Sequence, residues 1–148
     1  MVKNCNCLVK ISTGPNCSDM TYVEDWYVHG RLADGFSWAK TIKPGHGELN
    51  GVLSYERDWS WVGCSGYVTY KMFDTEITIA FSNPSVGTNK LGVGTGGKAV
   101  WDNMNNENYN WFTVNVVSNN GEVNVQLDCR CTTGTINTCT VNVTAYKK

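Results

Sequence analysis

The chain has 148 residues and a formal net charge of −1 at pH 7, with 12 Lys and Arg residues against 13 Asp and Glu. A chain of this length is sufficient for one domain with a buried core, so we expect residues 1–148 to form a single domain. The near-neutral charge, without any basic run, argues against nucleic acid as a partner. No apolar run is long enough to span a membrane, and residues 1–4 do not begin an apolar signal segment.

Alternating apolar and polar residues predict four short strands in the first third of the chain. The first begins near the N-terminus and places Cys7, Val9 and Ile11 on one face. In the second, Trp26 is expected to face inward and Gly30 to mark a bulge. The four predicted strands cover residues 5–12, 22–32, 36–42 and 48–55.

The stretch from Gly63 to Lys90 predicts a β-hairpin that runs into a polar loop. Alternation begins at Tyr67 and resumes after a turn at Asp74-Thr75, so we expect one buried face and one solvent face. The buried face is expected to hold Ile77, Ile79 and Phe81, and the solvent face Glu76, Thr78 and Ala80. The loop Ser82-Asn83-Pro84 then presents polar groups at the end of a strand.

The second half predicts a glycine-rich loop over 87–98, a short helix over 99–106 and three more strands. Gly92–Lys98 matches a phosphate-loop spacing, but the strand–loop–long helix context is missing, so we do not expect a nucleotide. An Asn-Gly pair at Asn120-Gly121 predicts a hairpin turn between two of the strands. The three strands cover 111–117, 122–127 and 140–146. Alternation places one set of apolar residues of each strand inside: Phe112, Val114 and Val116, then Val123, Val125 and Leu127, and finally Val141, Val143 and Ala145. A total of about eight to ten strands predicts an all-β, single-domain sandwich or closed barrel with one short helix.

Seven cysteines favour an oxidising compartment, so we expect some disulfide bonds and a secreted protein; mostly free, buried thiols are the alternative. The odd number leaves at least one thiol without a partner in the chain. Two sequons, at Asn16 and Asn142, fit secretion. The Cys-x-Cys spacing differs from that of zinc sites and no His lies near either pair, so we expect no metal or other cofactor. The cysteines are Cys5, Cys7, Cys17, Cys64, Cys129, Cys131 and Cys139.

Catalytic patterns are sparse, whereas aromatic residues suggest binding. Neither His29 nor His46 lies near a nucleophile pattern, so we do not expect an enzyme. Trp59 and Trp61 lie in a polar loop, where an indole either packs back or is held out for a ligand, and both alternatives stay open. Three other tryptophans lie in predicted strands and are most simply core residues: Trp26, Trp38 and Trp111.

The central stretch resembles the actinoporins, the pore-forming cytolysins of sea anemones. The resemblance rests on Gly63-x-x-Gly66-Tyr67-Val68-x-Tyr70-x-Met72, followed by an alternating strand and Phe81-Ser82-Asn83-Pro84. Ile42-Lys43-Pro44-Gly45 is similar to the turn that precedes this hairpin in the family, and Val100-Trp101-Asp102 to the start of its tyrosine-bearing helix. The fungal fruit-body lectins share this β-sandwich.

The resemblance implies a site for phosphocholine headgroups or glycans at one end of the sandwich. Ser82 and Pro84 match the headgroup loop of the actinoporins, and Trp101 falls where a family tyrosine contributes from the helix. Asn83 matches an asparagine that contacts sugar in the lectins. The amphipathic N-terminal helix that lines the pore is not encoded ahead of the first strand, and the aromatic cluster after the loop is replaced by Lys90-Leu91-Gly92-Val93-Gly94.

These departures favour a lectin-like, non-enzymatic protein that binds glycans or lipid headgroups through end loops. Its ligand-binding residues are expected to be Ser82, Asn83, Pro84, Trp101, Trp59 and Trp61. Because a single site of this kind is weak, we expect homo-oligomers to add avidity and haemagglutinating activity. The first alternative is an actinoporin-type cytolysin that docks on a membrane surface and inserts a different segment. The second is a structural or adhesion protein that uses the sandwich without a small ligand.

Overall fold

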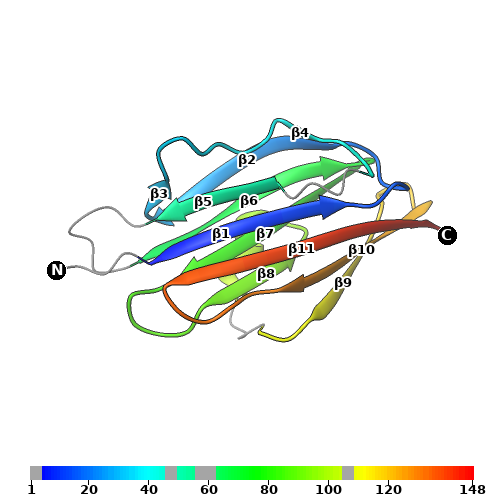
Figure 1. Ribbon diagram of the computed structural model, residues 1–148. Helices are drawn as coiled ribbons and strands as arrows, with labels where there is room; N and C mark the ends of the chain where they lie inside the picture. The colour runs from blue at the N-terminus through cyan, green and yellow to red at the C-terminus, as the bar shows by residue number, and fades with distance from the viewer. Residues whose placement is uncertain (1–4, 46–49, 56–62, 105–108) are drawn as a thin grey trace.

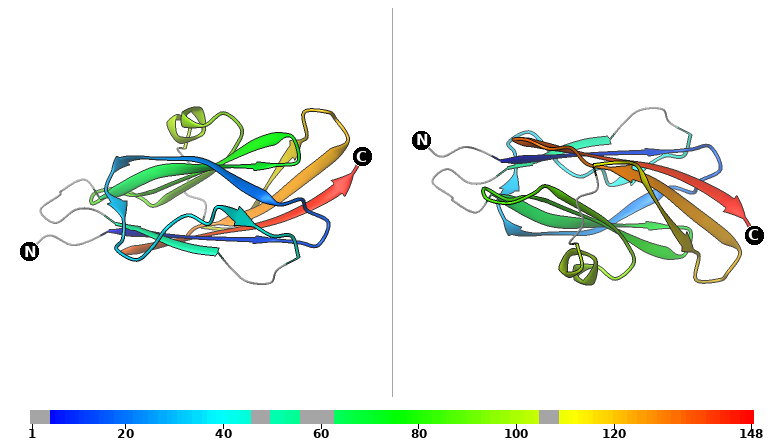
Figure 2. Two further views of the ribbon diagram at one scale, coloured as in Figure 1. Left: turned by 90° about the horizontal axis from the view of Figure 1, so that it is seen from above. Right: turned by 90° about the horizontal axis from the view of Figure 1, so that it is seen from below.

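A computed structural model of the chain describes residues 5–45, 50–55, 63–104 and 109–148, and the backbone alone for 50–55. In this part of the chain, eleven strands form two sheets that pack face to face, and one short helix lies outside them (Figures 1 and 2). The prediction of an all-β sandwich is confirmed. Trp59, Trp61 and His46 lie outside the described residues.

The first sheet has six strands in the order β3-β5-β1-β11-β10-β9. The two strands nearest the chain termini, β1 and β11, pair in parallel at its centre, and the remaining pairs are antiparallel. The strands are β1 (Asn6–Thr13), β3 (Arg31–Leu32), β5 (Asn50–Tyr55), β9 (Phe112–Val117), β10 (Val123–Arg130) and β11 (Ile136–Lys147).

The second sheet has five antiparallel strands in the order β4-β2-β6-β7-β8. They are β2 (Met20–His29), β4 (Thr41–Ile42), β6 (Cys64–Met72), β7 (Thr75–Asn83) and β8 (Lys90–Gly94). Helix α1 (Lys98–Asp102) follows β8 and lies on the outer face of this sheet (Figure 2). No described helix is long and apolar enough to cross a membrane.

The core lies between the two sheets and follows the predicted alternation. Cys7, Val9 and Ile11 project into it from β1 and are at most 1% exposed. The predicted inner residues of the last three strands also reach it. They are Phe112, Val114 and Val116 on β9, Val123, Val125 and Leu127 on β10, and Val141, Val143 and Ala145 on β11.

The hairpin β6–β7 confirms its predicted buried face, whereas the opposite face departs from the prediction. Ile77, Ile79 and Phe81 are fully buried between the sheets. Thr78 and Ala80 are also fully buried, although they were expected to contact solvent. The reason is α1, which covers this part of the outer face: Met104, just after the helix, packs with Ala80, and the Gly97 amide donates to Thr78 Oγ1 at 3.0 Å.

Two other segments differ from the sequence-based expectations. Of the strand expected over 36–42, only Thr41–Ile42 joins a sheet; the preceding residues are held by the Trp38 side chain, whose Nε1–H donates to Tyr27 Oη at 2.9 Å. The loop expected over 87–98 contains the strand β8. Glycines suit this strand because a Cβ at Gly92 would already press on Met104, at 3.3 Å.

All seven cysteines are buried, and no sulfur–sulfur bond joins them. The Sγ atoms of Cys7 and Cys64, on facing sheets, lie 3.3 Å apart. Burial raises the pKa of Cys7 well above its ordinary value and that of Cys129 to about 12. Because the thiolate is the reactive form, burial suppresses their oxidation. The expected disulfide bonds are not confirmed, and no group of three His, Cys, Asp or Glu side chains in the described residues is arranged to hold a metal ion.

Asp74, in the turn between β6 and β7, ties this hairpin to the β9–β10 turn. Its carboxylate accepts the Thr75 hydroxyl at 2.8 Å and the backbone amides of Asn119 and Asn120, each at 2.8 Å. The hydrogen bond from Thr75, followed by the two amides, lowers the pKa of Asp74 below its ordinary value of 3.8. The ends of the two sheets are therefore joined by a charged acceptor.

We expect this link to make stability depend on pH in acid. Because the pKa of Asp74 is lower in the folded protein, the stabilisation from its ionised carboxylate is fully present above about pH 3.8, the pKa of the unfolded chain. This stabilisation is lost as the pH falls through the folded pKa. The urea midpoint of the native protein should exceed that of Asp74→Asn at pH 7, and the gap should close below pH ~3.8. A gap that stays constant down to pH ~2.5 would contradict the role of the charge.

Candidate ligand-binding face

Three aromatic side chains gather on the outer face of the five-stranded sheet. Trp26 comes from β2, Tyr67 from its partner position on β6, and Trp101 from α1. The ring centroids of Trp26 and Trp101 lie 5.9 Å apart with the rings nearly perpendicular, at 87°. Those of Trp26 and Tyr67 lie 5.6 Å apart. We call this cluster the aromatic corner.

Trp26 faces outward because the pairing of β2 with β6 is irregular. The register shifts between Tyr22 and Glu24, where Val23 has no partner residue on β6. One extra residue in a strand reverses the side of the residues that follow it, up to the next irregularity. Trp26 is therefore 36% exposed, while its neighbour Tyr27 packs against the core. The prediction that Trp26 is a core residue is wrong. The register of β2 and β6 shifts a second time between Tyr27 and His29, directly before the predicted bulge position Gly30.

Trp101 is held by a hydrogen bond to the sheet beneath it. Its Nε1–H donates to Ser65 Oγ at 2.7 Å, and that hydroxyl donates to the carbonyl of Phe81 at 3.3 Å. Ser65 is only 4% exposed, so the indole is anchored to a buried partner. Trp101 thus belongs to a surface with a fixed geometry, as a binding site requires.

Charged groups surround the aromatic corner. The Lys98 Nζ lies 5.6 Å from the ring centroids of both Trp26 and Trp101, and 2.8 Å from Asp102 Oδ1. Glu24 Oε1 accepts the Tyr67 hydroxyl at 3.3 Å. Burial first, and then the charge of Glu24, raises the pKa of Tyr67, while Lys98 opposes the shift. Tyr67 is therefore a neutral hydrogen-bonding group at physiological pH.

The predicted loop residues occupy different positions around this face. Ser82 pairs with Ser65 in the register of β6 and β7, and alternation places its side chain on the outer face with Ala80. Pro84 is half-buried just beyond it. Asn83 is 2% exposed and points the other way: its Nδ2 donates to the carbonyls of Asn6, Gly134 and Thr135 at 2.9, 3.2 and 2.9 Å. The structure therefore brings Ser82 and Trp101 to one face, and Asn83 to the interior.

The other two tryptophans among the described residues are separate from the aromatic corner. Trp38 is a core residue, as predicted, at 8% exposure. Trp111 was also expected in the core, but it precedes β9 and is 52% exposed, with the Arg130 guanidinium 5.6 Å from its ring centroid.

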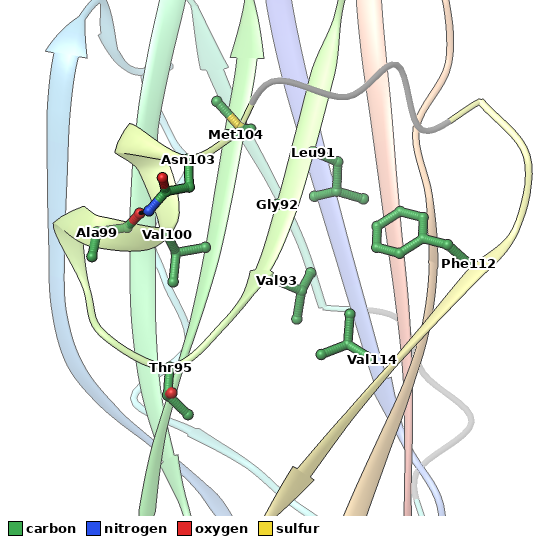
Figure 3. Close-up of a pocket in the computed structure, with 10 residues that line it drawn as sticks. All are labelled: Leu91, Gly92, Val93, Thr95, Ala99, Val100, Asn103, Met104, Phe112 and Val114. Atoms are coloured by element: carbon green, nitrogen blue, oxygen red, sulfur yellow. Dashed lines mark hydrogen bonds between the residues drawn. The ribbon is translucent and has the colours of Figure 1, made fainter.

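A cavity of about 510 Å³ lies beside α1, between β8 and β9 and apart from the aromatic corner (Figure 3). Its lining combines apolar side chains with polar atoms in similar amounts, and no residue of the aromatic corner lines it. The lining residues are Leu91, Gly92, Val93, Thr95, Ala99, Val100, Asn103, Met104, Phe112 and Val114.

Sequence reasoning did not identify Trp26, Tyr67, Ser65 or Lys98 as site residues. A signal for two of them was present, since Ser65 and Tyr67 flank Gly66, the second glycine of the motif that carries the family resemblance. A Cβ at Gly66 would lie 2.2 Å from the carbonyl oxygen of Trp26. This glycine therefore marks the point where the bulged strand approaches β6.

No family model and no curated protein matches the chain, but several solved structures do. The lipid-binding protein Nakanori aligns over 95% of this chain and 70% of its own, with 18% identity and a TM-score of 0.64. RahU, solved with a Tris molecule, aligns over 97% and 95%, with 13% identity and a TM-score of 0.56. The wild-type lectin XCL of Xerocomus chrysenteron aligns over 97% and 99%, with 16% identity and a TM-score of 0.53. The fold is actinoporin-like. The family resemblance read from the hairpin is thus confirmed for the fold.

Proposed function

We propose that the chain is a non-enzymatic, lectin-like protein that binds a glycan on the outer face of the five-stranded sheet. The observation that carries this proposal is the aromatic corner: two perpendicular indoles and a tyrosine, with one indole anchored to a buried hydroxyl. An aromatic surface with a few convergent polar groups is the usual composition of a small-ligand site. Lectin and lipid-binding proteins with this fold support the proposal.

The groups around the corner suit a sugar ring. Trp26 is exposed enough to receive the apolar face of a sugar, and an indole combines an apolar body with a polar tip. Ser82, Glu24 and Lys98 supply a hydroxyl, a carboxylate and an ammonium for the sugar hydroxyls. Asn83 takes no part because its amide is used inside the protein. A shallow face of this kind binds weakly, so we propose that homo-oligomers add avidity.

Truncating the corner should abolish glycan binding without unfolding the protein. We expect the native protein to bind on a glycan array and to agglutinate red cells, with inhibition by the same sugar. Trp26→Ala should weaken binding to that sugar at least about tenfold, because it removes the stacking surface. Calorimetric titration with the sugar measures the loss.

Trp111→Ala is the matched control, because it removes an indole that is also exposed but lies directly before β9 of the other sheet. It should leave glycan affinity unchanged. Equal losses in the two variants, or a blank array with the folded native protein, would count against the proposed function.

The alternative function is membrane binding of the cytolysin type, with a lipid headgroup at the same face. The observation that favours it is Val86, which is 90% exposed on the loop that follows Pro84 and β7. An exposed apolar loop tip beside a headgroup site is suited to a membrane surface. Dye release from sphingomyelin vesicles tests this alternative, and intact vesicles at micromolar protein would exclude it.

A further inference from the structure

The aromatic corner already contains a cation. The Lys98 ammonium lies over the rings of both Trp26 and Trp101, at the same 5.6 Å from each centroid. Two rings at 87° form two walls, and an ammonium at equal distance from both faces is in the position of a bound cation. The side chain is 54% exposed, so it reaches this position from solvent and is not buried there by packing.

The negative charges facing this position come from two elements, α1 and β2. Asp102, on α1, holds the Lys98 ammonium directly at 2.8 Å. Glu24, on β2, lies across the corner and accepts the hydroxyl of Tyr67, which comes from β6. The corner therefore combines aromatic faces with carboxylates, which is the composition of sites that bind organic ammonium groups.

We propose that Lys98 determines the specificity of the aromatic corner: its ammonium occupies the place of a quaternary ammonium group, so the corner excludes choline headgroups and accepts neutral sugars. The part that concerns sugars rests on the proposed function. The exclusion of ammonium ligands rests on the position of Lys98 alone.

The exclusion follows from competition and repulsion. A trimethylammonium ligand would have to displace Lys98 from both ring faces, and a like charge held nearby would oppose it. A neutral sugar meets no such repulsion. The ammonium has three N–H donors, and Asp102 takes one of them, so donors remain for sugar hydroxyls when the flexible side chain swings aside. Lys98 therefore weakens the binding of quaternary ammonium ligands and assists the binding of neutral sugars.

The experiment uses tetramethylammonium chloride as the probe and the indole Nε1–H resonances of Trp26 and Trp101 as the readout. Trp26→Phe and Trp101→Phe assign the two resonances. Lys98→Ala should bind the probe about tenfold more tightly than the native protein, because the ring faces become vacant. Lys98→Arg keeps a cation beside the rings and should bind the probe as weakly as the native protein. Phosphatidylcholine vesicles should likewise sediment more Lys98→Ala than native protein.

Lys71→Ala is the control for net charge. Lys71 is exposed on β6, four residues and about 13 Å along the strand from Tyr67, and its removal should leave probe binding unchanged. Equal probe affinity in Lys98→Ala and the native protein would overturn the proposal, as would the same gain in Lys71→Ala or no shift of either resonance in any variant. A blank glycan array would instead reject the proposed function, while the tetramethylammonium titration would still report on Lys98.

Discussion

Replacing Gly66 with alanine is expected to lower the free energy of unfolding by at least about 3 kcal/mol. A Cβ at this position would lie 2.2 Å from the Trp26 carbonyl oxygen and 3.1 Å from Tyr27 Cα. The obstacle is backbone, which no rotamer change relieves. β2 and β6 would have to separate where the bulge turns Trp26 outward. Urea denaturation followed by far-UV circular dichroism measures the loss.

Gly94→Ala is the matched control, since Gly94 is also a strand glycine of the same sheet. Its Cβ would meet only Val100 Cγ2, at 3.7 Å, which is ordinary van der Waals contact. We expect a change within about 0.5 kcal/mol of zero. If the two variants were equally stable, close backbone approach would not be the reason for glycine at position 66.

Removing the Asn137 amide is expected to cost about 3 kcal/mol of unfolding free energy. Asn137 lies on β11 of the six-stranded sheet and is fully buried. Its Nδ2 donates to the carbonyls of Ser82 and Lys90 in the opposite sheet, at 2.9 and 3.1 Å, and its Oδ1 accepts the Thr132 amide at 3.2 Å. Asn137→Ala leaves all three backbone groups buried without this partner, and each such group costs about 1–3 kcal/mol.

Because Asn137 holds both ends of the segment that carries Ser82 and Pro84, the same change should also weaken glycan binding. Asn124→Ala is the control: its Nδ2 donates to Asn115 Oδ1 at 3.1 Å in an exposed pair on the outer face of the six-stranded sheet. It should cost less than about 0.5 kcal/mol. Chemical denaturation of both variants measures the difference, and similar midpoints would refute a special role for the buried amide.

The difference between Trp26 and Trp38 shows where prediction from sequence stopped. Both tryptophans lie in predicted strands, and both were expected in the core. Trp38 is buried against Phe81, whereas one unpartnered residue at Val23 turns Trp26 to the outer face. Alternation reports which residues share a side, but a bulge depends on the partner strand and leaves no mark of its own in the alternation of a single strand.

Asn83 shows the same limit for the candidate site. An asparagine at the end of a strand, beside Pro84, is typical of a ligand-facing loop, and the family resemblance supported that reading. In the structure its amide donates to three carbonyls, all of them more than 50 positions away in the chain. Whether an amide faces solvent or supports the backbone depends on which carbonyls the fold brings to it, and those carbonyls belong to β1 and to the loop before β11.

The sequence by itself determined the class of the fold and most of its core. Period-two alternation and turn residues are local properties, so the inner faces of β1, β7, β9, β10 and β11 were predicted correctly. Only the tertiary structure decided the outer face of the second sheet. There α1 covers Thr78 and Ala80, the bulge exposes Trp26, and Lys98 comes to lie over two indoles from different elements. Except for the contact between Lys98 and Trp101, which lie three residues apart on α1, these contacts join residues distant in the chain, and no local pattern encodes them.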